Sequence, residues 1–135
     1  MKLKIGINGM GRIGRMIVRA IIENNNKNID IKHINNRTSL EVCSRLLKYD
    51  SNHGRFNKNI KYNKNYLLIN KKKISFSQET DLNNINWKRL GVDIVFECTG
   101  KFNSKDKLLP HLKNGAKKVI VSAPCKNADR TVVFG

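Results

Sequence analysis

The sequence predicts an α/β fold in which a doubly wound parallel sheet carries a small antiparallel meander insertion. Short apolar runs alternate with segments of helical periodicity, the order that places helices on both faces of a parallel sheet. The stretch 58–78 departs from this order, because its three short apolar runs are too close together for helical crossovers. A chain of 135 residues is long enough for one domain with a substantial core, and no internal linker divides it.

The first half of the chain supplies two strands, each followed by a helix. Residues 2–8 form the first strand and residues 11–23 a helix. The expected inward positions of this helix are Ile13, Ile17, Ala20 and Ile21. A second strand at 29–35 follows a polar loop, and Ser39 or Thr38 caps the next helix. The expected inward positions of that helix are Leu40, Cys43, Leu46 and Leu47.

The second half begins with the meander and then returns to the parallel pattern. The meander strands are expected at 59–62, 66–69 and 73–76, with Asn/Lys turns between them. A strand at 92–96, a helix at 104–113 and a strand at 117–121 follow. The last residues, 131–135, are predicted to form a further strand.

The first strand leads into a glycine pattern, Gly9-x-Gly11-x-x-Gly14, at the start of the first helix. Here the first glycine permits a tight turn, the second lets the backbone approach phosphates, and the third lets helix and strand pack closely. The N–H groups and the positive dipole end of the helix then face the anion. The pattern predicts a Rossmann-type site for a dinucleotide pyrophosphate; the alternative is an ordinary glycine turn between strand and helix.

Composition excludes several other classes of protein. No apolar run approaches the roughly 20 residues of a membrane helix. The first apolar stretch ends at Asn8-Gly9, too early for a secretion signal, so we expect a cytoplasmic protein without membrane contact. The three cysteines are widely spaced and form no Cys-x-x-Cys pattern, so neither a disulfide framework nor a metal site is expected.

The formal net charge of +17 has two interpretations. Such a charge is typical of proteins that bind nucleic acid or a membrane surface. Here, however, the only tight basic runs are 71–73 and 117–118, and the other lysines are interspersed with asparagine and isoleucine, as codon bias would produce. We therefore expect nucleic acid to bind only non-specifically, through electrostatic contacts that salt weakens.

The end of the second strand bears on the choice of dinucleotide. A Rossmann site usually has an acidic residue there, about 20 residues past the glycines, which binds the adenosine ribose and repels a 2′-phosphate. Here Asn36 and Arg37 occupy that place. Asn36 can hydrogen-bond a hydroxyl but repels nothing, and Arg37 can pair with a phosphate. Two interpretations remain open. Either the site accepts NADP, with Arg37 paired to its 2′-phosphate, or Arg37 is solvated and the site binds NAD through Asn36.

With these motifs in view, the chain resembles glyceraldehyde-3-phosphate dehydrogenase. The resemblance rests on motifs in the family's order: the stretch 6–15, Leu46-Leu47-Lys48-Tyr49-Asp50-Ser51-x-His53-Gly54-Arg55-Phe56, Trp87, Phe96-Glu97-Cys98-Thr99-Gly100-x-Phe102, and Val121-Ser122-Ala123-Pro124. The ending, Ala128-Asp129-x-Thr131-Val132-Val133-Phe134-Gly135, is similar to the erythrose-4-phosphate dehydrogenase branch of the same family.

The resemblance implies which residues bind the cofactor, NAD or NADP. The implied residues are Asn8, Gly9, Gly11, Arg12, Ile13, Gly14, Asn36, Arg37, Thr99, Gly100 and Ser122. By this resemblance the glycine turn meets the pyrophosphate, Asn36 meets the adenosine ribose, and Ser122 lies near the nicotinamide. Thr80 stands where a basic residue near the adenine is common in the family.

Simpler interpretations stand beside these assignments. Arg12 also fits a solvated helix face, and Thr99-Gly100 also fits a strand end followed by a turn glycine. His53 is better read as a structural hydrogen-bonding residue than as a catalytic one. The pattern assigns no role to His33 or His111.

The resemblance also implies the chemistry of the whole enzyme. A cysteine thiolate attacks the aldehyde, hydride passes to the nicotinamide, and phosphate releases the acyl group. In the family that cysteine lies in a Ser-Asn-Ala-Ser-Cys-Thr-Thr-Asn segment, just beyond the strand that here ends at Gly135. None of Cys43, Cys98 and Cys125 has this context.

We therefore expect residues 1–135 to be a dinucleotide-binding domain, incomplete at its C-terminal end, that lacks the catalytic residues and domain of a homotetrameric enzyme. The expected result is a cofactor-binding chain without activity, with apolar surface left exposed.

Overall fold

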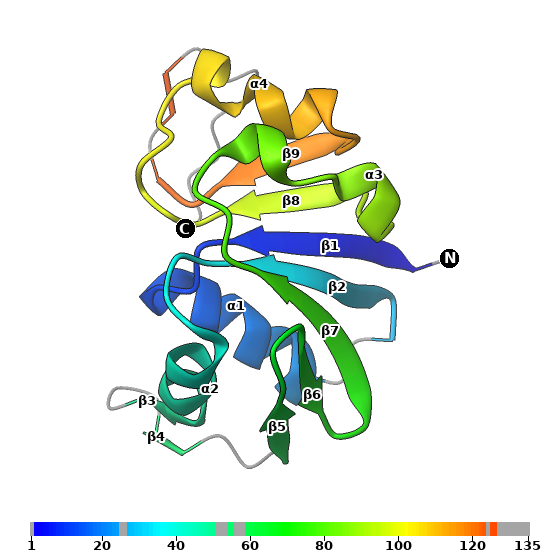
Figure 1. Ribbon diagram of the computed structural model, residues 1–135, viewed down its shortest axis with the longest axis vertical. Helices are drawn as coiled ribbons and strands as arrows, with labels where there is room; N and C mark the ends of the chain where they lie inside the picture. The colour runs from blue at the N-terminus through cyan, green and yellow to red at the C-terminus, as the bar shows by residue number, and fades with distance from the viewer. Residues whose placement is uncertain (1, 25–26, 51–53, 56–58, 124, 127–135) are drawn as a thin grey trace.

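The computed structural model describes residues 2–24, 27–50, 54–55, 59–123 and 125–126 (Figure 1). Its elements are β1 (Leu3–Asn8), α1 (Arg12–Glu23), β2 (Ile29–Asn35), α2 (Leu40–Lys48), β3 (Tyr49–Asp50), β4 (Gly54–Arg55), β5 (Ile60–Tyr62), β6 (Tyr66–Ile69), β7 (Lys72–Ser77), the 3₁₀ helix η1 (Leu82–Asn84), α3 (Trp87–Leu90), β8 (Ile94–Glu97), α4 (Lys105–Lys113) and β9 (Lys118–Val121).

Seven strands of the described chain form one sheet in the order β5-β6-β7-β2-β1-β8-β9. The run from β7 to β9 is parallel, whereas β5, β6 and β7 pair in antiparallel fashion. The chain therefore leaves β1 toward β2 on one side and returns to β8 on the other, which confirms the doubly wound parallel sheet with its meander. Strand β7 belongs to both parts, because it pairs with β6 and with β2.

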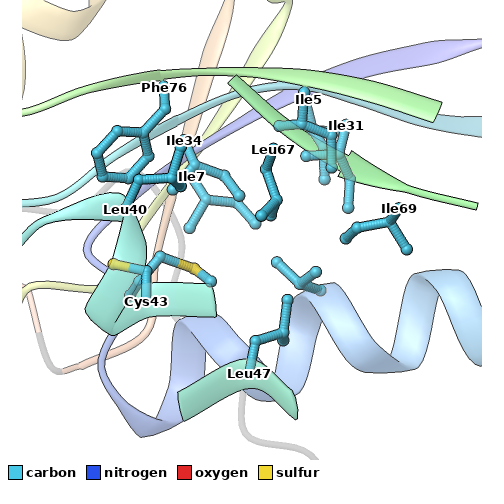
Figure 2. Packing of buried hydrophobic residues seen from close by; sticks show 13 residues of the cluster. Ile5, Ile7, Ile31, Ile34, Leu40, Cys43, Leu47, Leu67, Ile69 and Phe76 are labelled. Atoms are coloured by element: carbon cyan, nitrogen blue, oxygen red, sulfur yellow. The ribbon is translucent and has the colours of Figure 1, made fainter. Parts of the chain in front are cut away.

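One face of the sheet carries the larger apolar core, which Figure 2 shows between the strands and helices α1 and α2. Alternate residues of the parallel strands, such as Ile7 of β1 and Ile34 of β2, point from the sheet toward these helices. Val18 of α1 and Leu47 of α2 meet them from the other side. Both side chains are completely buried, so this layer fixes the two helices on the sheet.

The helix positions differ in part from the sequence prediction. Ile13 and Ala20 are exposed, while Val18 is buried in their place. The reason lies at Gly14, which packs on the glycine turn and thereby directs the residue one turn later, Val18, into the core. In α2, Cys43 and Leu47 point inward as predicted, but Leu46 is 41% exposed.

The opposite face of the sheet is covered by a smaller core around Trp87 of α3, with Leu82, Ile85, Val92, Val95 and Ala116. Trp87 lies directly over Gly6, where a Cβ atom would come within 2.5 Å of the indole ring. The central strand thus needs glycine at this position so that the indole can lie against the sheet.

Several smaller elements were not predicted: β3, β4, η1 and α3 are each four residues long or shorter. The strand expected at 92–96 spans Ile94–Glu97, and Ser104 precedes α4 as its N-cap residue. The strand predicted at 131–135 and the structural role predicted for His53 lie outside the described residues.

His33 of β2 is a buried polar group on the Trp87 face of the sheet. Its Nδ1 lies 2.6 Å from Ser75 Oγ and its Nε2 2.7 Å from Ser77 Oγ, both on the neighbouring strand β7. The indole of Trp87 packs against its edge at 5.7 Å between ring centroids. Burial lowers the pKa of His33 to about 4, so the imidazole is neutral at pH 7.

We expect His33 to make the fold sensitive to acid. The unfolded chain takes up a proton at this side chain near pH 6.5 and the folded chain only near pH 4, so stability falls as the pH drops through that window. At the acid end of this window, near pH 4, His33 lowers the free energy of unfolding by about 3 kcal/mol. Urea unfolding of wild type and His33→Gln between pH 7 and pH 4 measures it. The stability difference between the two proteins should change across the window, and a constant difference would contradict the assignment.

Candidate functional site: a dinucleotide groove

The glycine turn between β1 and α1 has the geometry that the sequence predicted. Gly9 has a φ of +101°, and a Cβ atom there would lie 2.8 Å from the backbone nitrogen of Thr99. At Gly14 a Cβ atom would come within 2.2 Å of the carbonyl oxygen of Gly9. Gly11 differs from both, since an added Cβ would meet nothing within 4 Å. Two of the glycines are therefore required by the fold, whereas the third leaves an open approach to the start of α1.

Asn36, from the connection between β2 and α2, and Arg15, from α1 itself, hold this turn in place. Asn36 Oδ1 accepts a hydrogen bond of 2.9 Å from Met10 N, and Arg15 Nη1 donates to Met10 O at 3.2 Å. The amide nitrogen of Asn36 donates to Thr38 Oγ1 at 2.6 Å and to Cys43 Sγ at 3.1 Å. Both amide hydrogens of Asn36 are thus already used within the protein.

A groove of about 690 Å³ opens beside the turn, at the carboxyl ends of the parallel strands (the left edge of the sheet in Figure 1). It is lined by Asn8, Gly9, Gly11, Asn35, Asn36, Arg37, Thr38, Glu79, Thr80, Leu82, Cys98, Thr99, Lys101 and Phe102. Strand β1 is flanked there by β2 and β8, which connect to it in opposite directions along the sheet. Open α/β sheets bind their ligands at this switch point.

Six of the eleven residues predicted for cofactor binding line the groove: Asn8, Gly9, Gly11, Asn36, Arg37 and Thr99. Arg12 and Ile13 are exposed in the first turn of α1, and Gly14 is buried beneath that turn. Gly100 and Ser122 are exposed just beyond the carboxyl ends of β8 and β9. The lining of the groove does not include these five residues, and their contact with a cofactor stays a prediction.

Sequence reasoning missed Asn35 and Glu79, which join the two connections that form one end of the groove. Asn35 Oδ1 accepts from Glu79 N at 2.8 Å, and Asn35 Nδ2 donates to Glu79 O at 2.9 Å. A polar residue ending a buried apolar strand was the available signal for Asn35. Glu79 carried no such signal, because only the pairing of β7 with β2 brings it to the groove.

Glu97, the last residue of β8, lies beneath the other end of the groove and is 1% exposed. Its Oε1 is 2.7 Å from Asn8 Nδ2 and 2.9 Å from His111 Nε2. Its Oε2 is 2.6 Å from Thr99 Oγ1 and 3.0 Å from Thr99 N. Burial alone would raise the pKa of Glu97, but the hydrogen bonds from His111, Thr99 and Asn8 outweigh it and hold the pKa below its usual value.

The thiol of Cys98, which also lines the groove, is protonated at neutral pH and therefore a poor nucleophile. Burial is the largest cause of its raised pKa of about 11, and the negative charge of Glu97 raises the pKa further. A hydrogen bond with Ser122 acts in the opposite direction but does not outweigh them. Among the described residues, no group of three His, Cys, Asp or Glu side chains is placed to hold a metal ion. Within the same part of the chain, no helix is long and apolar enough to cross a membrane.

These features fit a dinucleotide. The helix N-terminus offers N–H groups to an anion, Gly11 leaves space for it, and the groove extends to both sides of the turn.

Comparison with known proteins gives the same result. Residues 3–105 match the family model described as glyceraldehyde 3-phosphate dehydrogenase, NAD binding domain. The chain is 46% identical over 135 residues to the glyceraldehyde-3-phosphate dehydrogenase of Geobacillus stearothermophilus, covering 100% of this chain and 40% of that protein. It is 45% identical over 132 residues to that of Thermotoga maritima (98% and 40% covered). Glyceraldehyde-3-phosphate dehydrogenase 2 of Bacillus subtilis is 44% identical over 135 residues (100% and 39% covered).

The chain thus spans about 40% of the length of these relatives. Together, the fold, the glycine turn and these similarities show that the chain belongs to the glyceraldehyde-3-phosphate dehydrogenase family of oxidoreductases and carries that family's NAD-binding domain.

Proposed function

We propose that this chain binds NAD or NADP in the groove between the glycine turn and the carboxyl ends of β2 and β8. The observation that carries the proposal is the turn itself, in which Gly9 and Gly14 are required by packing and Gly11 is open toward the groove. The first turn of α1, with Arg12 and Ile13, would hold the pyrophosphate. The bound nicotinamide would supply a hydride acceptor.

The adenosine end of the dinucleotide belongs beside Asn36 and Arg37, at the carboxyl end of β2. Because both amide hydrogens of Asn36 are engaged, this side chain offers a ribose hydroxyl only an acceptor. We infer that NADP is accepted alongside NAD, with the exposed Arg37 pairing with the 2′-phosphate. Glu79, which lines the same part of the groove, opposes this preference through its negative charge.

For the protein as a whole we propose the oxidation of glyceraldehyde 3-phosphate to an acyl phosphate in glycolysis. The names of its relatives support this substrate. Erythrose 4-phosphate is the alternative, on the likeness of the sequence at 128–135. We further propose a cytoplasmic location and a homotetramer in the full-length protein, with Thr99, Gly100 and Ser122 on the nicotinamide side. The charge of +17 supports only non-specific, salt-sensitive binding of nucleic acid.

Two glycine variants, compared by calorimetric titration with NAD, test the proposed binding mode. Gly14→Ala places a methyl group against a backbone carbonyl, so it should destabilise the fold by several kcal/mol, on the order of 3 kcal/mol. Gly11→Ala meets no protein atom and should melt within a few degrees of wild type, yet lose at least about tenfold in NAD affinity. Unchanged NAD affinity in Gly11→Ala would contradict the proposed binding mode.

A second pair of variants tests the choice of dinucleotide. Arg37→Gln removes the cation that would pair with the 2′-phosphate, so the affinity ratio of NADP to NAD should fall by about tenfold. Glu79→Gln removes the opposing charge while leaving the backbone contacts with Asn35, so the same ratio should rise. A wild-type preference for NAD of tenfold or more would count against NADP as a ligand, as would a ratio that neither variant changes.

A further prediction concerns catalysis by the 135-residue chain. The described thiols contact hydroxyl, amide or carbonyl groups rather than an imidazole, and Cys98 has a raised pKa. We therefore expect no NADH formation from glyceraldehyde 3-phosphate and inorganic phosphate at 340 nm, under conditions in which NAD is bound. A rate abolished by Cys98→Ser would disprove this expectation.

A further inference from the structure

The carboxylate of Glu97 is surrounded by hydrogen-bond donors whose directions the structure determines. The indole N–H of Trp87 can only donate, and it lies 2.9 Å from Nδ1 of His111. Nδ1 of His111 therefore carries no proton, so the imidazole is neutral and its Nε2–H points to Glu97.

The other two neighbours of Glu97 are fixed as donors by backbone groups. The N–H and C=O of Glu79 set the orientation of the Asn35 amide, whose nitrogen donates to Asn8 Oδ1 at 2.8 Å. Asn8 must then turn its own amide nitrogen toward Glu97. Thr99 Oγ1 accepts from Lys101 N at 3.1 Å, so its hydroxyl hydrogen is directed to Glu97.

All four contacts thus donate to Glu97, and a carboxyl group that only accepts is ionised. Among the described residues, its one ion-pair partner is the imidazole of His111, which is neutral. Glu97 therefore holds a full negative charge that hydrogen bonds stabilise, and within the described part of the chain no cationic side chain forms an ion pair with it. Because it is buried, salt screens this charge far less than it would screen a surface charge.

The position of this charge relative to the groove is set by the sheet. Glu97 ends β8, and its partners Asn8, at the end of β1, and Thr99, just past β8, both line the groove. Thr99 thus lies on the side of β1 away from the β2 connection that carries Asn36 and Arg37. With the adenosine at the end of β2 and the pyrophosphate at the turn, the nicotinamide half belongs on the β8 side.

We propose that Glu97 makes the groove select the oxidised form of the cofactor, because the oxidised nicotinamide ring is a cation and the reduced ring is neutral. This inference rests on the proposed binding of a dinucleotide. It assigns Glu97 the role of a specificity-determining charge that acts on the ring across Asn8 and Thr99.

The test is the Glu97→Gln variant, with calorimetric titrations of NAD⁺, NADH and ADP-ribose at one pH and ionic strength. Glutamine has the same shape: its oxygen can accept from Asn8 and His111, and its NH₂ group can donate to the hydroxyl oxygen of Thr99, but the hydrogen bond from Thr99 N is lost. The matched control is Asp93→Asn, which removes one negative charge at the opposite, amino end of β8. Thermal melting and circular dichroism verify that both variants fold.

We expect Glu97→Gln to lower the affinity for NAD⁺ at least about threefold relative to the affinities for NADH and for ADP-ribose, which lacks the nicotinamide. Asp93→Asn should leave all three ratios unchanged. Equal changes for the three ligands in Glu97→Gln would mean a purely structural role and overturn the inference. Suppose that wild type binds ADP-ribose and both dinucleotides, and that the affinity ratios among these ligands are the same in Glu97→Gln as in wild type. Only the present inference then fails, and the proposed function stands. If wild type binds none of them, the proposed function fails with it.

A second measurement needs no substitution and decides the question if Glu97→Gln does not fold. Benzamide adenine dinucleotide is a neutral analogue of NAD⁺ with carbon in place of the charged ring nitrogen. Wild type should bind it at least about threefold more weakly than NAD⁺. Equal affinity for the two compounds would overturn the proposal.

Discussion

The close approach of α1 to the glycine turn is the constraint on which the rest of the structure depends. Gly14 lies so near the carbonyl oxygen of Gly9 that any side chain would force them apart. This approach fixes the rotation of α1, so that Val18 enters the core and Ile13 stays at the surface. It also fixes the direction of the helix, whose first N–H groups face the open space beside Gly11. One packing contact thus determines both the core and the proposed anion site.

The two faces of the sheet divide the remaining tasks. The face toward α1 and α2 is an apolar layer that supplies stability (Figure 2). The opposite face carries His33, Asn35, Asn8 and Glu97 in neighbouring strands, joined by hydrogen bonds to one another or through Ser77. Because adjacent parallel strands end at the same edge, these polar residues meet where the groove opens. The register of the strands therefore places the polar layer directly beneath the site.

Sequence reasoning found what local patterns encode and missed what only the sheet brings together. The glycine spacing and the apolar periodicity predicted β1, α1 and β2, because the pattern of each lies within about 15 consecutive residues. Glu79 and Glu97 were missed as parts of the site, since each depends on strand pairing between distant segments. His111 lies on a mostly polar helix, and nothing in that pattern shows that its ring is completely buried against Trp87. Leu46 was placed inward because periodicity cannot fix a helix rotation to within one residue.

The fixed direction of the hydrogen bonds around Glu97 also has a consequence for proton movement. A chain of hydrogen bonds conducts protons only when each member can both give and receive one. Here the indole of Trp87 cannot accept, and His111 could pass its Nε2 proton to Glu97 only by becoming an anion. The route from the groove through Glu97 to α3 is therefore closed to proton conduction. A proton in the groove therefore cannot pass through the sheet along this route.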